Sequence, residues 1–353
     1  MKLQLLTLSG MSLLSASVLA DAARDEWERG MEQRLQRIEG QGQSQQEEQP
    51  AWYDAIELEG LVEVEVNRVS PEHGDTTSDI NVATVELGLE AEVNAWVAVE
   101  LLLLYEEETD NNGDFNVDTA LITLADPDAN WFVRAGRSTL PFGLYPTQMI
   151  SDPLTLELGE TNDSAIEAGY AVGELAFSLF LFQGDQNDKA DNFGAQLDYD
   201  GEIAGVSSHF NLGYLDNLAE SDTIVDEGWV TVDDKMAAWT ASAEFGIGPW
   251  TLIGDYLDVH DGFADASDES PSVYNLELGY DLEVAGLPVN VAIGYQASDG
   301  AEESNWGLPE KRLIGGFSIE LLEETELGFE FKRDEDYAGE RENTLTAQLA
   351  VSF

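Results

Sequence analysis

The chain has 353 residues, of which 15 are Lys or Arg and 71 are Asp or Glu, so its formal net charge at pH 7 is -56. It contains no cysteine, which excludes disulfides and thiolate metal sites. Such a negative field repels the phosphates of nucleic acids, so we expect no nucleic-acid partner. The hydrophobic share of 43% is close to that of ordinary globular proteins, so the chain is not disordered as a whole.

Residues 1–20 have the pattern of a secretory signal peptide. A positive charge at Lys2 precedes an apolar run that contains no acid and ends at Leu19. Small residues then allow cleavage after Ala20 or Ala22. An uncleaved membrane anchor is the alternative, but the run is short for a membrane span and is interrupted by serine and glycine. We therefore expect the protein to be exported.

Residues 21–50 are predicted to form a periplasmic amphipathic helix followed by a polar linker. Trp27, Met31, Leu35 and Ile38 recur at steps of 4, 4 and 3, which places them on one helix face. The polar remainder of this segment has nothing to bury. About two heptads are marginal in isolation, so the helix is either a short oligomerising coiled coil or a loosely attached amphipathic helix.

From residue 51 onward the apolar residues recur with a period of two, which predicts β-strands. We count 16 such segments, separated by turns that contain glycine. Every second connection is tight, as at Gly173-Glu174 and Glu323-Glu324, and the connections between the tight ones are long. The apolar stripe of the first segment consists of Ile56, Leu58, Val62, Val64 and Val66.

This sorting of connections predicts an all-β fold of the outer-membrane type. In an outer-membrane barrel one rim faces the periplasm with short turns and the other faces the exterior with long loops, whereas a soluble sandwich has no reason to sort its loops. We therefore predict that residues 51–353 form a transmembrane antiparallel β-barrel of about 16 strands in a Gram-negative outer membrane. An even strand number places both barrel ends on the periplasmic rim, beside the predicted helix. Sixteen strands leave an aqueous channel.

In a bilayer the apolar stripe of each strand faces lipid and the polar stripe lines the lumen. Phe353 lies in register with the lipid-facing stripe and resembles the C-terminal aromatic residue by which bacterial outer-membrane proteins are recognised for assembly. Outer-membrane lipid and the barrel-assembly machinery are therefore expected partners. The aromatic residues at strand ends that suit interfacial girdles are Tyr214, Trp250, Tyr256, Tyr274, Tyr280 and Tyr295.

The acidic charge belongs almost entirely to the predicted barrel. Residues 1–20 hold one basic residue, and residues 21–50 hold four basic and eight acidic ones, which leaves 10 basic and 63 acidic side chains for residues 51–353. Two explanations remain open: an acidic lumen that enriches cations, or an acid-rich surface adapted to a salty habitat. The acids expected to face the lumen are Glu57, Glu59, Glu63, Glu65, Glu86, Glu90 and Glu92.

The third long connection, within Arg134–Thr161, is the most distinctive segment. It has the ordinal position of the loop that folds into large porins and narrows them. Arg134 alternates with Val133 and Ala135, so we expect it to point inward as a counter-charge, with Arg137 near the rim. The alternative is an external loop whose acids are only solvated. The predicted pore and constriction residues are Arg134, Arg137, Asp152, Glu157 and Glu160.

This segment also carries a family motif. Gly136, Arg137, Leu140–Gly143 and Tyr145, continuing into Met149–Thr161, resemble the LbtU family of siderophore porins, and the core of the motif occurs more loosely in phosphate-selective porins. The resemblance implies a 16-stranded outer-membrane porin associated with ferric-siderophore uptake, without the plug domain and energy-coupling box of the large receptors. A phosphate pore fits less well, because such pores use ladders of Arg and Lys, and basic residues are scarce here.

The predicted function is thus a passive water-filled channel for ferric siderophores, without a cofactor or a bound metal, as a monomer or a homotrimer. The alternatives are a general diffusion porin for small cationic solutes and a secreted acidic all-β binding protein. We expect no enzyme, because His73, His209 and His260 are scattered and form no catalytic pattern. The segment Asp110–Asp118 resembles a calcium loop, but its glycine comes two positions early and no Glu closes it.

Overall fold

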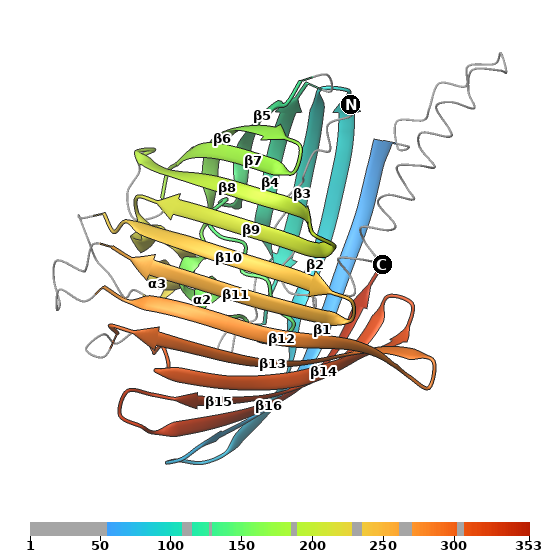
Figure 1. Cartoon of the computed structure of the whole chain (residues 1–353), viewed down its shortest axis with the longest axis vertical. Helices are drawn as coiled ribbons and strands as arrows, with labels where there is room; N and C mark the ends of the chain where they lie inside the picture. The colour runs from blue at the N-terminus through green and yellow to red at the C-terminus, as the bar shows by residue number, and fades with distance from the viewer. Residues whose placement is uncertain are drawn as a thin grey trace.

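A computed structural model shows 16 antiparallel strands that close into a single barrel (Figure 1). The structure describes residues 55–107, 115–126, 129–184, 189–227, 235–260, 270–301 and 307–353. The predicted signal peptide and the helix and linker of residues 21–50 lie outside these ranges. The strands are β1 (Ile56–Pro71), β2 (Thr77–Asn94), β3 (Val97–Tyr105), β4 (Asn116–Ala125), β5 (Trp131–Thr139), β6 (Asn162–Val172), β7 (Leu175–Phe182), β8 (Asn192–Ile203), β9 (Val206–Leu215), β10 (Ala238–Ile247), β11 (Trp250–Val259), β12 (Ser272–Val284), β13 (Leu287–Asp299), β14 (Lys311–Leu322), β15 (Thr325–Glu335) and β16 (Arg341–Ser352).

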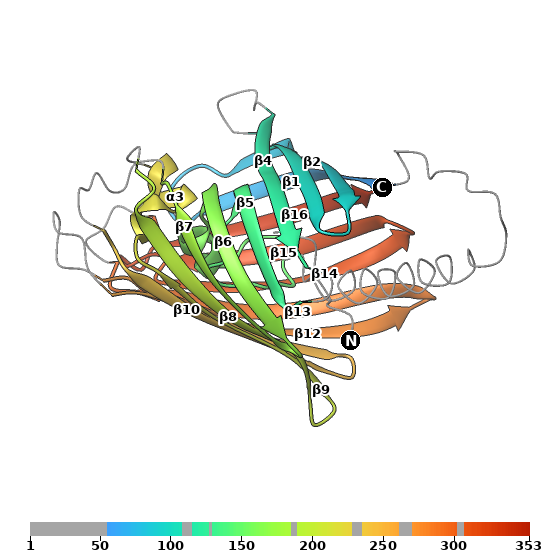
Figure 2. The same cartoon turned by 90° about the horizontal axis from the view of Figure 1, so that it is seen from above.

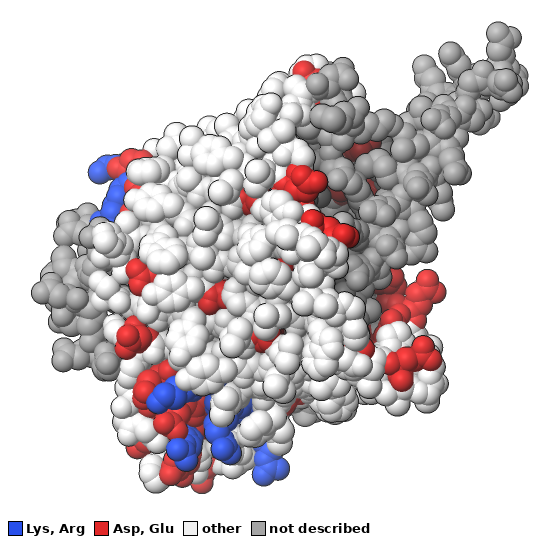
Figure 3. Space-filling model, viewed as in Figure 1, with Lys and Arg blue, Asp and Glu red and all other residues white. Residues whose placement is uncertain are grey.

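The strands form because apolar and polar residues alternate along them, with the apolar side turned outward. On β16, Leu345 and Leu349 are exposed on the outside, whereas Thr346 and Gln348 between them are buried inside. On the face shown in Figure 3, the middle of the barrel is mostly uncharged, with scattered acidic side chains and no visible Lys or Arg. This inversion of the usual core pattern is what a barrel surrounded by lipid requires.

Pairing of β1 with β16 closes the barrel and leaves no unpaired sheet edge. Val64 faces Leu349 and Val66 faces Ala347 across this seam. The seam continues to the end of the chain, where the Gly60 N–H donates to the Phe353 carbonyl oxygen at 2.8 Å. The predicted all-β fold with about 16 strands is confirmed.

The two rims differ as the sequence predicts, with tight turns at one and long connections at the other. At the short-turn rim, Ala204 and Gly205 have φ of 55° and 85°, and Ala285 and Gly286 have φ of 55° and 87°. Positive φ at both central residues is the signature of a type I′ turn, whose twist matches that of the flanking strands. The start of β1 and the end of β16 lie at this rim. The opposite rim is called the long-loop rim below.

In the described parts of the long connections, three short helical segments occur, in two of them. The connection after β5 contains α2 (Leu154–Gly159), and the connection after β9 contains η3 (Leu218–Glu220) and α3 (Asp222–Asp226). Figure 1 shows α2 and α3 behind the front strands of the barrel, and Figure 2 shows α3 at the long-loop end. Among the described residues, no helix has both the length and the apolar composition needed to cross a bilayer.

Candidate functional site

The connection between β5 and β6, residues 140–161, folds into the barrel. Its helix α2 packs against the inner faces of β11, β12 and β13. Leu154 and Leu158 of α2 are fully buried and belong to one apolar cluster with Leu257 of β11 and Val273 of β12. Apolar residues therefore occur on the inner face of the barrel where α2 packs, so burial of apolar surface draws the loop inward.

Two glutamates of the barrel wall hold this loop through its backbone N–H groups and a hydroxyl group. Glu277 of β12 accepts hydrogen bonds from the Thr147 hydroxyl at 2.9 Å and from the Gln148 N–H at 2.8 Å. Glu330 of β15 accepts from the N–H groups of Ile150 and Ser151 at 2.7 and 3.1 Å. Hydrogen bonds to a carboxylate are stronger than those between neutral groups, so these two acids hold the loop against the barrel wall.

A glycine on the wall makes room for the loop at the same place. Gly279 of β12 lies opposite the Gln148 side chain, and a Cβ atom on Gly279 would be 1.6 Å from the Gln148 side-chain oxygen Oε1. The same oxygen accepts a hydrogen bond from Asn290 of β13 at 3.1 Å. Loop and wall are therefore shaped to fit each other over several neighbouring strands.

Arg312 of β14 is a cation on the inner face of the wall that contacts the loop. Its guanidinium is buried and donates to Glu157 at 2.7 Å and to Asp334 of β15 at 2.8 Å. It also donates to the backbone carbonyl oxygen of Asp152 at 3.2 Å. This one side chain thus joins α2 and the chain before it to two strands of the wall. The sequence prediction missed Arg312, although alternation along β14 places it inward beside the outward Lys311.

Asp152 and Glu160, two of the predicted constriction acids, lie at the two ends of α2. Burial raises the pKa of Asp152 well above its ordinary value, and the nearby Glu160 and Glu157 raise it further. Its Oδ1 atom is buried and accepts no hydrogen bond from the described residues. Burial raises the pKa of Glu160 to about 7, with the negative charges of Asp222 and Asp118 as further causes. Burial thus favours the protonated form of both acids.

A second connection, the one between β9 and β10, also packs into the barrel at the long-loop end. Leu218 and Ile224 are fully buried in the same apolar cluster as Leu140 and Phe142 of the first loop. The Asp222 carboxylate accepts the backbone N–H of residue 162 at 3.0 Å, which ties the two loops together. The sequence prediction did not place this connection inside, because no periodic pattern marks it.

The predicted lumen acids lie on β1 and β2. Cross-strand pairing aligns Glu57 with Glu90 and Glu63 with Thr84, and the alternate positions on both strands carry the outward apolar residues. Glu65 accepts hydrogen bonds from Asn67 and from Gln348 of β16. The register thus places the whole predicted set on the inward face: Glu57, Glu59, Glu63, Glu65, Glu86, Glu90 and Glu92.

This acidic side and the loop-covered side lie opposite each other. In the ring of 16 strands, β1 and β2 stand across from β9 and β10, where the apolar cluster and the two loops pack. Between the loop and the inner faces of β14 to β16 a cavity remains, lined by loop residues 148–150 and by Glu326, Glu330 and Gln348. The interior is therefore divided into a side filled by the two loops and a side lined by the acids of β1 and β2.

The two predicted arginines take different positions. Arg134 lies on the inner face of β5 and pairs with Glu167 of β6 at 3.4 Å, with its guanidinium 4.8 Å from the centre of the Phe132 ring. Arg137 is aligned with Ala120 and Ser164, two residues of the outward stripes, near the long-loop end of β5. The described contacts join the loop acid Glu157 to Arg312 and not to Arg134.

Among the described residues, His209 forms no hydrogen bond with a serine or threonine hydroxyl that could act as a nucleophile. Its Nε2 lies 2.9 Å from the Asp198 carboxylate, which also accepts from Asn211 at 3.2 Å. The neighbouring Ser208 hydroxyl donates to the Val206 carbonyl oxygen at 3.1 Å. Within the described ranges, no group of three or more His, Cys, Asp or Glu side chains could hold a metal ion.

Comparison of sequences finds relatives of low identity, and no protein-family profile matches the chain. The chain is 23% identical over 338 residues to the UPF0422 protein of Coxiella burnetii, covering 84% of this chain and 72% of that one. It is 24% identical over 333 residues to the UPF0422 protein lpp3030 of Legionella pneumophila strain Paris, covering 79% of this chain and 62% of that one. The chain thus spans less than two thirds of the Legionella protein.

Comparison of structures finds outer-membrane porins. OprB of Pseudomonas putida superposes with a TM-score of 0.61 at 10% identity, covering 85% of this chain and 94% of that one. OmpF of Salmonella typhi gives a TM-score of 0.57 at 11% identity over 86% and 99% of the two chains. The trimer form of OmpT of Vibrio cholerae gives 0.51 at 11% identity over 85% and 100%. At these identities the likeness establishes the porin fold.

Proposed function

We propose that this protein is an outer-membrane porin: a passive, water-filled channel whose acidic side favours cations. The observation that carries the proposal is the division of the barrel interior into a side filled by two loops and an opposite side lined by carboxylates. A pore wall of one charge sign raises the local concentration of the opposite ions. The porin fold and the many exposed apolar side chains of the outer surface support a place in the outer membrane.

The narrowest part of the channel, in this proposal, lies beside α2. Its acids are Asp152, Glu157 and Glu160, with Arg312 holding Glu157 against the wall. Because burial favours the protonated forms of Asp152 and Glu160, a cation passing there meets fewer charges than the sequence alone implies. The acids of β1 and β2 then provide most of the field that attracts cations, and Arg137, on the outward register, contributes little to it.

The proposal also names a class of transported solute. The motif around Gly136–Gly143 supports uptake of a ferric siderophore, since it resembles siderophore porins. An acidic lumen repels polycarboxylate complexes and admits neutral or cationic ones, such as ferric trihydroxamates, in which three anionic groups balance the Fe³⁺ charge. We propose this second class as the solute, with small cations as the general cargo. The trimer form of the Vibrio cholerae porin supports a homotrimer.

The test is conductance of the refolded barrel in a planar bilayer while ferric complexes are titrated in. Current steps that a trihydroxamate complex blocks, and that a ferric polycarboxylate complex at the same concentration does not, would support the solute class. Block by neither complex would leave a general diffusion pore and remove the siderophore role. A preparation that is folded, soluble without detergent and unable to conduct would instead favour the secreted binding protein.

A further inference from the structure

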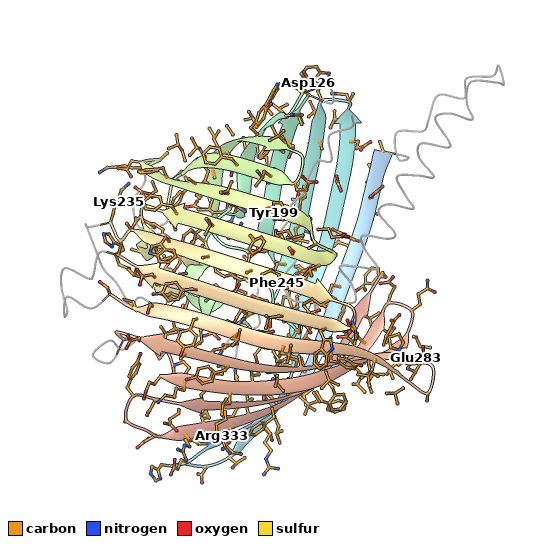
Figure 4. The ribbon with its side chains drawn as sticks, viewed as in Figure 1. Asp126, Tyr199, Lys235, Phe245, Glu283 and Arg333 are labelled. Atoms are coloured by element: carbon orange, nitrogen blue, oxygen red, sulfur yellow. The ribbon has the colours of Figure 1, made fainter. Side chains whose placement is uncertain are left out.

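Four of the ten basic side chains in residues 51–353 gather outside the lumen, on the outer face of adjacent strands at the long-loop rim. We call Arg68, Lys311, Arg333 and Arg341 the basic rim patch. Figure 3 shows it as the blue side chains at the lower left, which lie among red acidic ones, and Figure 4 labels Arg333 within it. A cation-attracting lumen gives no reason for positive charge at this place.

The strand register makes the patch continuous over β14, β15, β16 and β1. Lys311 lies opposite Glu335, which lies opposite Arg341. One row further down the barrel wall, Arg333 lies opposite Asn343. These outward positions are adjacent on the barrel surface, although the residues are far apart in the sequence.

The patch borders the apolar band of the barrel directly. Arg68 is aligned with Leu345, and Arg333 is aligned with Leu313. These two leucines are more than half exposed on the outer surface, as members of the stripe that faces lipid in the proposed membrane orientation. Positive charge immediately beyond such a band lies at the height of the lipid headgroups.

The charges of the patch are only partly neutralised. Lys311 pairs with Glu310 at 2.5 Å, and Arg341 pairs with Glu335 at 2.7 Å. Arg333 donates to the amide oxygen of Asn343 at 2.7 Å. Neither Arg68 nor Arg333 forms an ion pair with any residue in the part of the chain that the structure describes. Two guanidinium groups thus retain their positive charge for an outside partner.

We propose that the basic rim patch binds the phosphate groups of an outer-leaflet glycolipid of the lipid A type. The proposal rests on the membrane orientation proposed above. A guanidinium matches a phosphate in charge and in the geometry of its paired N–H donors. The partner must also cover the apolar residues below the patch, because these continue without a break from Leu313 and Leu345. A phosphorylated lipid meets both requirements, whereas free phosphate meets only the first.

The test is native mass spectrometry of the purified barrel released from detergent, with the fraction that retains one lipid as the readout. The probes are diphosphorylated lipid A, dephosphorylated lipid A and inorganic phosphate as a competitor. We expect the wild type to retain the diphosphorylated lipid in preference to the dephosphorylated one. Arg68→Gln and Arg333→Gln should each weaken retention about fivefold, the effect of one cation near an anionic lipid surface.

Lys189→Gln is the matched control, because it removes one exposed positive charge from the long-loop rim at a distance in strand order from the patch. Equal retention of both lipids by the wild type would overturn the proposal, and this comparison needs no variant to fold.

Displacement of lipid A by inorganic phosphate at equal concentration would mean that the patch binds phosphate and not the lipid. A change of oligomeric state in the arginine variants, with lipid retention unchanged, would make it a contact between copies. A barrel that conducts but lacks the lipid preference contradicts this proposal alone.

Discussion

Arg312 shows how much of the candidate constriction depends on one side chain. It is buried and holds Glu157 of α2 and Asp334 of β15 at hydrogen-bond distance. Alternation along β14 places a residue at position 312 inside the barrel, but it does not say which acid meets it. That pairing depends on the position of the loop inside the barrel. A sequence pattern could therefore predict that Arg312 points inward, but not which acids it contacts.

Replacing Arg312 by Gln should loosen the loop from the wall. The two carboxylates would lose their shared cation, at a cost of roughly 1 to 3 kcal/mol in the free energy of unfolding. We expect lower heat resistance of the folded barrel on gels and larger, noisier current steps. Lys311→Gln, on the outward side of the same strand, is the control. Unchanged current in Arg312→Gln would mean that the loop is held without it.

The raised pKa of Glu160 predicts a pH effect of defined sign. Its pKa is about 7 in the folded protein, against an ordinary value of 4.5. Between these two values the folded protein keeps a proton that the unfolded chain has lost, so the free energy of unfolding falls as pH rises through this window. Glu160→Gln should remove this component and be more stable than the wild type at pH 8.

The measurement for Glu160 is urea unfolding at pH 4 and at pH 8. The gain from Glu160→Gln should be present at pH 8 and nearly absent at pH 4. Glu174→Gln, at an exposed short turn, should show no such difference. A gain of the same size at both pH values would contradict the assignment.

At the scale of the elements, the strands were predictable and the interior packing was not. Strand number and face follow from the alternation of residues and from the sorting of loops, because both are local patterns. The anchoring of the loop by Glu277 and Glu330 joins residues more than 120 positions apart, and nothing local to either acid reveals it. The inward course of the connection after β9 was missed for the same reason.

Glu277 and Glu330, which hold the loop against the wall, give a prediction about the loop as a whole. Glu277→Ala combined with Glu330→Ala removes the carboxylates that accept hydrogen bonds from the loop N–H groups. Each such hydrogen bond contributes about 1.5 to 3 kcal/mol to stability. The loop should then leave the wall more often, so single-channel recordings should show larger conductance with frequent switching between levels. The double variant of Glu323 and Glu324 to Ala, at a short turn, is the control. Recordings identical to the wild type would show that apolar burial alone holds the loop.

At the scale of the whole molecule, the outer surface carries the claim that the barrel spans a membrane. Leu278 and Leu282 lie on the outward face of the same strand, Leu278 near the middle of β12 and Leu282 near the short-turn rim. The cost of an outward Arg in a bilayer is about 2 to 4 kcal/mol at the midplane and falls toward the interfaces. Leu278→Arg should therefore destabilise the barrel in liposomes much more than Leu282→Arg.

Equilibrium unfolding in liposomes measures this difference, with each variant compared to the wild type. Equal effects of the two substitutions would mean that the bilayer surrounds another part of the barrel, or that the barrel does not span a bilayer. The same depth scale locates the basic rim patch, since its arginines lie at the end of the outward stripe where such charges cost least.

The most direct measurement of the central claim is the reversal potential of the purified barrel in a planar bilayer under a potassium chloride gradient. An acidic passage of the kind proposed predicts discrete current steps and a reversal potential of the sign that marks cation selectivity, larger at low salt because screening is weaker. Current steps with anion selectivity, or a correctly folded and inserted barrel that passes no current, would contradict the account.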